Sequence, residues 1–184
     1  MMKRSIGSLL ALLTPFVLTF CNNNDNNNVV TPATNGVVGI FDACDPVTFN
    51  AALGAGTCTG VAAVNDSVTF IEFEQELRAN RAVGAWRFIP RALSITPGGT
   101  VTATNLGGQT HTFTEVAHFG GGIEPALNEA SGNPVEVPEC AAITEIDLIL
   151  PEASFTTAPI LGSGPHLFQC CIHPWMRATV TGVP

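Results

Sequence analysis

The chain has 184 residues, enough for one ordinary domain with a targeting segment or small appendage, and too few for a typical two-domain enzyme. It is 46% hydrophobic and only 12% charged, and its 18 Gly and 13 Pro favour a turn-rich β protein over a helical bundle or a disordered acidic chain. The 7 Lys and Arg residues are outnumbered by 15 Asp and Glu, so a nucleic-acid partner is not expected. The sequence also holds six Cys, whose chemistry depends on the compartment.

Residues 1–20 have the pattern of a secretory signal peptide. Lys3 and Arg4 precede an apolar run that is too short and too interrupted for a membrane-spanning helix. Cys21 follows directly, and the Asn-rich composition of residues 21–36 is typical of a flexible tether. The pattern resembles a bacterial lipoprotein signal, in which such a Cys is acylated, and plain secretion with cleavage nearby is the alternative. Both routes predict a periplasmic or cell-surface protein, and in the acylation route an N-terminal lipid anchor is its only membrane attachment.

Residues 37–84 are expected to form a small helical extension. Asp45 and Pro46 suit the N-cap and first position of a short helix. Cys44 and Cys58 bracket that helix, and in an oxidising compartment a disulfide between them is expected. On the entropic model such a loop closure stabilises by about 3 kcal/mol.

A second helix is expected over residues 67–80, with Asp66 or Ser67 as its N-cap. Its apolar residues share one face: Phe70, Phe73 and Leu77. This extension is interpreted as packing material rather than a functional site.

Over residues 85–184 the apolar residues alternate with polar ones, which is typical of half-buried strands. Two antiparallel strands are predicted on either side of the Pro97-Gly98-Gly99 turn. Further strands are predicted at 113–116 and 146–150. Two more are predicted near the end of the chain, one at 168–170 and, after a turn, another at 176–180. Short strands separated by Gly and Pro predict an all-β sandwich, with residues 118–142 as a long inserted loop.

A Cys, a His and a Met recur at three-residue spacing near the end of the chain, as Cys170, His173 and Met176. Thiolate, imidazole and thioether form a mixed ligand set that suits copper in both oxidation states. His111 follows a Gly-rich turn at the start of a predicted strand and is the candidate fourth ligand. Two His and one Cys in a trigonal set with a long axial Met form an electron-transfer copper site, so one type 1 copper per chain is expected.

Two adjacent Cys compete for the ligand position. Strand alternation places Phe168 and Cys170 together toward the sandwich interior, whereas Cys171 faces the opposite side. Cys170 is therefore the predicted thiolate ligand.

The region 86–184 resembles the cupredoxin family, the small blue copper proteins such as plastocyanin, amicyanin and pseudoazurin. The resemblance rests on four features: Phe88-Ile89-Pro90, the segment from Leu93 to Val101, Asn105 six residues before His111, and the closing Cys170, His173 and Met176. It implies a Greek-key β-sandwich for the domain 85–184 and the four copper ligands named above. It also implies that the backbone amide of Thr112 donates to the thiolate, with Asn105 in the surrounding shell of the site.

The resemblance implies a one-electron carrier between redox proteins rather than an enzyme. The acidic charge suggests a basic surface on those partners. Two other functions stay open: copper storage or delivery with the same ligands, and a metal-free structural module. The two remaining Cys, Cys140 and Cys171, are hypothesised to form a disulfide that holds the inserted loop to the base of the ligand turn.

Overall fold

The computed structural model describes residues 33–59 and 67–184. The predicted signal peptide, Cys21 and the tether up to residue 32 lie outside the described residues. In the part that is described, no helix has the length and apolar character needed to cross a membrane.

Eight strands and five short helical elements are present in the described residues. The strands are β1 (Gly36–Phe41), β2 (Arg87–Ile89), β3 (Ala92–Ile95), β4 (Val101–Asn105), β5 (Thr114–Val116), β6 (Ser154–Thr156), β7 (Gly164–Gln169) and β8 (Arg177–Gly182). The helices are α1 (Pro46–Leu53), α2 (Phe70–Asn80), α3 (Pro125–Ala130), α4 (Pro138–Ala141) and the 3₁₀-helix η1 (Glu145–Asp147).

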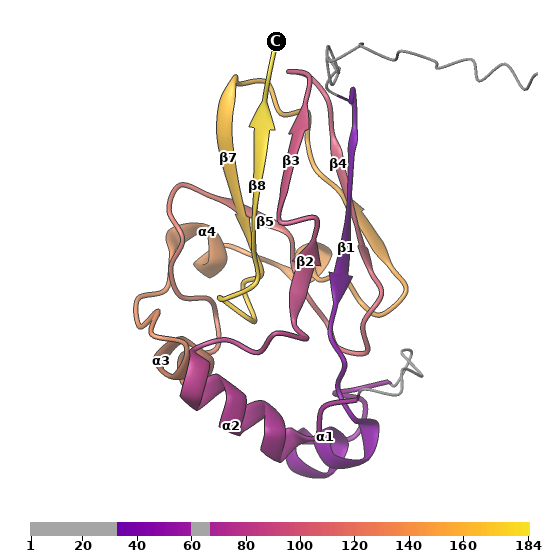
Figure 1. Ribbon diagram of the computed structural model, residues 1–184, viewed down its shortest axis with the longest axis vertical. Coiled ribbons are helices and arrows are strands. Elements are labelled where there is room, and N and C mark those ends of the chain that lie inside the picture. The colour runs from indigo at the N-terminus through magenta and orange to yellow at the C-terminus, as the bar shows by residue number, and fades with distance from the viewer. Residues whose placement is uncertain (1–32, 60–66) are drawn as a thin grey trace, which may run out of the picture. The chain divides into compact units, whose positions relative to one another are not determined.

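The strands form two four-stranded sheets, one in the order β2-β1-β4-β6 and the other in the order β3-β8-β7-β5 (Figure 1). Both sheets are mixed, because β1 pairs with β4 and β3 pairs with β8 in parallel, whereas the other pairs are antiparallel. The expected all-β sandwich is confirmed.

Alternating side chains from both sheets fill the core. Val38 and Ile40 of β1 are fully buried, as is Val180 of β8 from the other sheet. The rings of Phe113 and Phe168 stack with centroids 4.5 Å apart. Because Phe168 lies two residues before Cys170, this packing fixes the face of the chain on which the Cys170 side chain lies.

The prediction of an antiparallel pair around the Pro97-Gly98-Gly99 turn was wrong. β3 and β4 belong to different sheets, and the turn carries the chain from one sheet to the other. Alternation correctly indicated strands, but it does not specify partners. The partners here are distant in sequence: β4 pairs with β1 and β6, and β3 pairs with β8.

The first strand was also missed. β1 lies mostly in the range 37–84 that was expected to be a helical extension, yet it is an inner strand between β2 and β4. Ala33, in the range expected as tether, forms a bridge with Ile95 of β3. The helical extension therefore begins after β1, because the apolar residues of β1 pack into the core.

The extension itself contains the two expected helices and the Cys44–Cys58 disulfide. Asp45 caps α1 as expected, with its carboxylate accepting from the Thr48 amide at 2.8 Å. The cap of α2 is Thr69 rather than Asp66 or Ser67. Thr69 forms a reciprocal capping box with Glu72, which satisfies two free amides at once.

The strand expected over 146–150 does not form. The segment contains η1 and a single bridge between Ile149 and His111. In this segment Ile149 is buried, at 2% exposed, whereas Ile146 is 86% exposed. The bridge to His111 turns Ile149 inward.

The inserted segment 118–142 is more ordered than a loop, because it contains α3 and α4. It covers the face of the chain opposite the sandwich core, where Gln169 and Cys171 are fully buried. The Gln169 amide donates to the carbonyls of Gly120 and Gly121, both at 3.4 Å, in this segment.

Candidate metal centre

Three predicted ligands meet at one end of the sandwich, and one of them, His111, lies 59 residues before Cys170. His111 precedes β5, Cys170 directly follows β7, and His173 lies in the turn before β8. Their ligand atoms all lie within 4.8 Å of one another, and all three side chains are buried. Among the described residues this is the one such group of three or more His, Cys, Asp or Glu.

The thiolate lies almost equally far from the two imidazoles. Cys170 Sγ is 3.8 Å from His111 Nδ1 and 3.7 Å from His173 Nδ1. A metal about 2.0 Å from each nitrogen and about 2.3 Å from sulfur, with bonds about 120° apart, requires a nitrogen–sulfur separation of about 3.7 Å. The three residues therefore fit a trigonal metal site.

Met176, the fourth predicted ligand, is 1% exposed and lies beside the same turn. Its backbone closes the turn, because its amide donates to the His173 carbonyl at 2.9 Å and its carbonyl accepts from the Cys170 amide at 3.0 Å. These two hydrogen bonds fix the backbone conformation of the turn that carries Cys170 and His173. An axial role for the Met176 thioether stays a prediction.

Two backbone amides point to the Cys170 sulfur. The Thr112 amide donates to Sγ at 3.5 Å, as the resemblance implies, and the His173 amide donates at 3.4 Å. The Thr112 hydroxyl accepts from the Cys171 amide at 2.8 Å, which ties the two ligand segments together. Burial opposes ionisation of the thiol, but hydrogen bonds from His111 and His173 hold the pKa of Cys170 well below its usual value.

Asn105 supports the ligand loop without touching a ligand side chain. Its side-chain amide donates to the carbonyls of Gln109 at 2.7 Å and Ile149 at 2.8 Å, and its oxygen accepts from the Gly107 amide at 2.9 Å. These bonds define the path of the loop that leads from β4 to His111.

Asp42, which follows β1, was missed by the sequence analysis. Its Oδ2 lies 2.8 Å from His111 Nε2, and both side chains are completely buried. The same carboxylate accepts from the amides of Gly108 and Gln109, both at 3.0 Å. It thereby orients the imidazole so that Nδ1 faces Cys170 and Nε2 faces the carboxylate.

Asp42 and His111 each stabilise the charged form of the other side chain. Burial raises the pKa of Asp42, but the hydrogen bond with His111 and the two amide bonds more than offset this and lower it below 3.8. Burial likewise opposes protonation of His111, yet hydrogen bonds with Asp42 and Cys170 raise its pKa to about 9. A signal was present in the sequence, because an acidic residue ends an apolar strand at Asp42, but its partner lies 69 residues away.

The two expected disulfides are present, and Cys21 lies outside the described residues. Cys140 is bonded to Cys171, Cys44 to Cys58, and among the described residues Cys170 alone is a free thiol. Cys171 therefore joins the base of the ligand turn to α4 in the inserted segment.

Removing this disulfide should destabilise the protein. With a sequence separation of 31 between Cys140 and Cys171, the entropic model gives a loss of about 3–4 kcal/mol for the double variant Cys140→Ala/Cys171→Ala. Urea unfolding under non-reducing conditions would measure it. Equal midpoints for the variant and the unmodified protein would contradict the stapling role.

No protein-family model matches this chain, and no curated protein sequence matches it either. Several solved structures are similar to it. A purple cupredoxin from Nitrosopumilus maritimus is 15% identical with a TM-score of 0.44, over 81% of this chain and 100% of that protein. Plastocyanin from Dryopteris crassirhizoma is 25% identical with a TM-score of 0.37, over 53% of this chain and 89% of that protein.

Amicyanin from Paracoccus versutus is 17% identical with a TM-score of 0.35, over 55% of this chain and 77% of that protein. All three are cupredoxins, the family that the sequence resembles. We base the assignment of a metal to the site on the ligand geometry itself.

Proposed function

We propose that this protein holds one type 1 copper ion and carries single electrons between redox partners. The observation that carries the proposal is the buried Cys170 sulfur, 3.7 and 3.8 Å from two imidazole nitrogens. One thiolate, two imidazoles and a nearby thioether form the ligand set of electron-transfer copper. Bound copper would supply a one-electron redox couple at this position.

The chain's own part is to hold the ligands in place. His111 is held by Asp42 and by the bridge to Ile149, so its ring has little freedom to turn. Cys170 follows β7, and its sulfur accepts from two backbone amides. A site fixed in this way needs little rearrangement when its charge changes, which favours rapid outer-sphere transfer.

Burial favours a carrier over copper storage or delivery. His111 and Cys170 are 0% exposed, and His173 is 4% exposed, so an incoming acceptor ligand has little access to the metal position. A storage or delivery protein has to release its metal to another set of ligands. The cluster also favours a metal-binding protein over a metal-free structural module. Packing alone does not require a free thiol and two imidazoles to point at one another.

Export belongs to the same proposal. Two disulfides in one small domain are typical of an oxidising compartment, which supports a periplasmic or cell-surface location. Acylation at Cys21 would attach the protein to a membrane through lipid alone. The net charge of -8, or -10 once residues 1–20 are removed, supports partners with a basic docking surface.

Loading the purified protein with copper(II) tests the proposal directly. We expect one copper per chain, an intense visible thiolate-to-copper absorption band, and reversible loss of that band on one-electron reduction. Metal analysis, visible spectroscopy and exchange with a chelator measure these. A colourless loaded protein would contradict the copper site, and rapid loss of copper to the chelator would favour delivery instead.

A further inference from the structure

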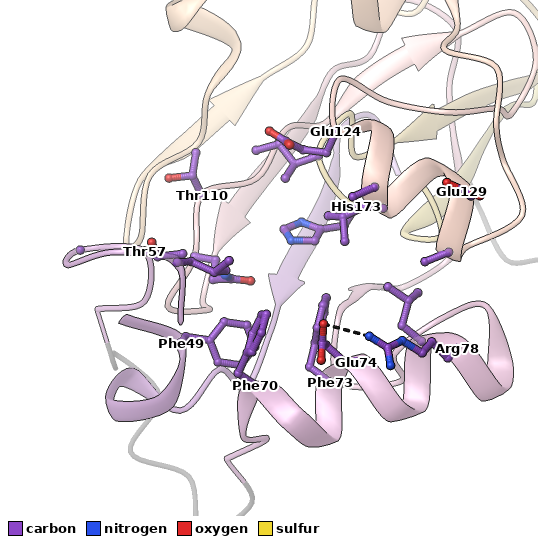
Figure 2. A pocket seen from close by; sticks show the side chains of 18 residues that line it. Phe49, Thr57, Phe70, Phe73, Glu74, Arg78, Thr110, Glu124, Glu129 and His173 are labelled. Atoms are coloured by element: carbon purple, nitrogen blue, oxygen red, sulfur yellow. Dashed lines mark hydrogen bonds and ion pairs between the residues drawn. The ribbon is translucent and has the colours of Figure 1, made fainter. Parts of the chain in front are cut away.

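A groove of about 790 Å³ lies beside the proposed copper ligand His173. Helix α2 and helix α3 form its opposite sides, and the imidazole lies between the phenylalanine rings of the extension and Glu124 (Figure 2). We call this the His173 groove. Its volume falls within the range of about 300–1,000 Å³ typical of small-molecule sites.

The floor of the His173 groove is apolar and rich in aromatic rings. Its main apolar residues come from α1, α2, α3 and the ligand turn: Phe49, Phe70, Phe73, Leu77, Leu127 and Ile172. The Phe49 ring meets Phe70 at a centroid distance of 5.4 Å and Phe73 at 5.5 Å, both edge to face. A planar aromatic ligand can add to such a cluster in the same edge-to-face manner.

Two hydrogen-bonding groups lie at the inner end of this surface. His173 presents Nδ1 to Cys170, which leaves Nε2 on the other edge of the ring, and metal binding at Nδ1 would leave a proton on Nε2. Gln109 is 6% exposed, and its oxygen accepts from the Trp86 indole at 2.7 Å. Within the described residues, the Gln109 amide nitrogen has no hydrogen-bond partner, although it can donate twice.

The outer edge of the groove is acidic. Glu74 is paired with Arg78 at 3.2 Å. Glu124, at the N-cap of α3, and Glu129 of α3 are exposed and have no ion-pair partner among the described residues. Unpaired carboxylates repel an anionic ligand and accept hydrogen bonds from a neutral one.

We propose that the His173 groove binds a small neutral aromatic molecule with ring hydroxyl groups, of the phenol or hydroquinone class. The ring packs against Phe49 and Phe73. A ring hydroxyl accepts from Gln109 and hydrogen-bonds with His173 Nε2, which accepts when Nδ1 carries the ring proton and donates when a metal occupies Nδ1. A hydroxyl at the far end of the ring donates to the carboxylates of the outer edge. Each part of the groove is thereby matched by one chemical feature of the ligand.

The binding experiment uses the protein without added metal, so its result does not depend on the copper proposal. The probe is 4-methylphenol, and 4-hydroxybenzoate is the matched anion with the same phenol ring. Titration followed by amide NMR shifts should perturb Gln109, Leu127 and His173, with the phenol binding at least about tenfold more tightly than the anion.

Two variants locate the site. Ala126→Trp places a large ring in the groove and should weaken phenol binding at least about tenfold, whereas Ala141→Trp, on exposed α4 outside the groove, should leave it unchanged. The double variant Glu124→Gln/Glu129→Gln should bring the two affinities together. Equal binding by Ala126→Trp and the unmodified protein, or no phenol binding at millimolar concentration, would overturn the proposal.

Discussion

Replacing Cys170 by Ser should abolish the visible copper band, while the double variant Cys140→Ala/Cys171→Ala should keep it. The band requires a thiolate bound to copper, and only the Cys170 sulfur lies near both imidazoles. A serine hydroxyl is a harder and weaker ligand for copper than a thiolate, so the affinity of the site for copper(I) should fall as well. Visible spectra and copper titrations of the three proteins measure both effects.

Cys170→Ser also serves as its own folding control. Its near-UV circular dichroism and unfolding midpoint should stay close to those of the metal-free parent, since Ser is smaller than Cys and keeps a hydrogen-bonding group. If the colour instead survives in Cys170→Ser and disappears in the double variant, the choice between the two adjacent Cys is reversed.

Replacing Asp42 by Ala should destabilise the metal-free protein by about 3 kcal/mol or more. The change leaves the His111 ring and the amides of Gly108 and Gln109 without their buried acceptor. Asp42→Asn keeps the volume and one acceptor, so its loss should be smaller. Urea unfolding measures both, and Glu136→Gln, an exposed carboxylate, is the neutral control.

Asp42→Asn also tests whether this carboxylate acts on the copper site. A negative charge hydrogen-bonded to a ligand stabilises the more positive oxidation state, so removing it should raise the reduction potential. A merely structural residue would change stability and leave the potential of the folded, copper-loaded protein unaltered. Potentiometry separates the two, and an unchanged potential would limit Asp42 to positioning His111.

The ligand set was accessible from the sequence because three of its four members lie within seven residues. Spacing and strand alternation together selected Cys170 over Cys171, and the structure places Cys170 beside both His. Asp42 was not accessible in this way. Its contact with His111 depends on β1 pairing with β4, and that pairing joins segments more than 60 residues apart.

In the fold, too, a feature set by neighbouring residues was predicted correctly, and one set by residues far apart in sequence was not. Asp45 and Pro46 predicted the start of α1 correctly, because capping is decided by neighbouring residues. The turn at Pro97-Gly98-Gly99 was assigned to a hairpin, although its two strands enter different sheets. Alternation specifies which side of a strand is buried, and the partner strand is decided by packing across the whole core.

The opposite orientation of Cys170 and Cys171 has a consequence for how the protein matures. Cys171 is joined to Cys140 on one side of the chain, while Cys170 faces the two imidazoles on the other. For the two neighbours to exchange their bonds, the end of β7 would have to turn over and expose Phe168. The strand register thus acts as a barrier to thiol–disulfide exchange, and it keeps one thiol in reserve for metal while its neighbour is oxidised.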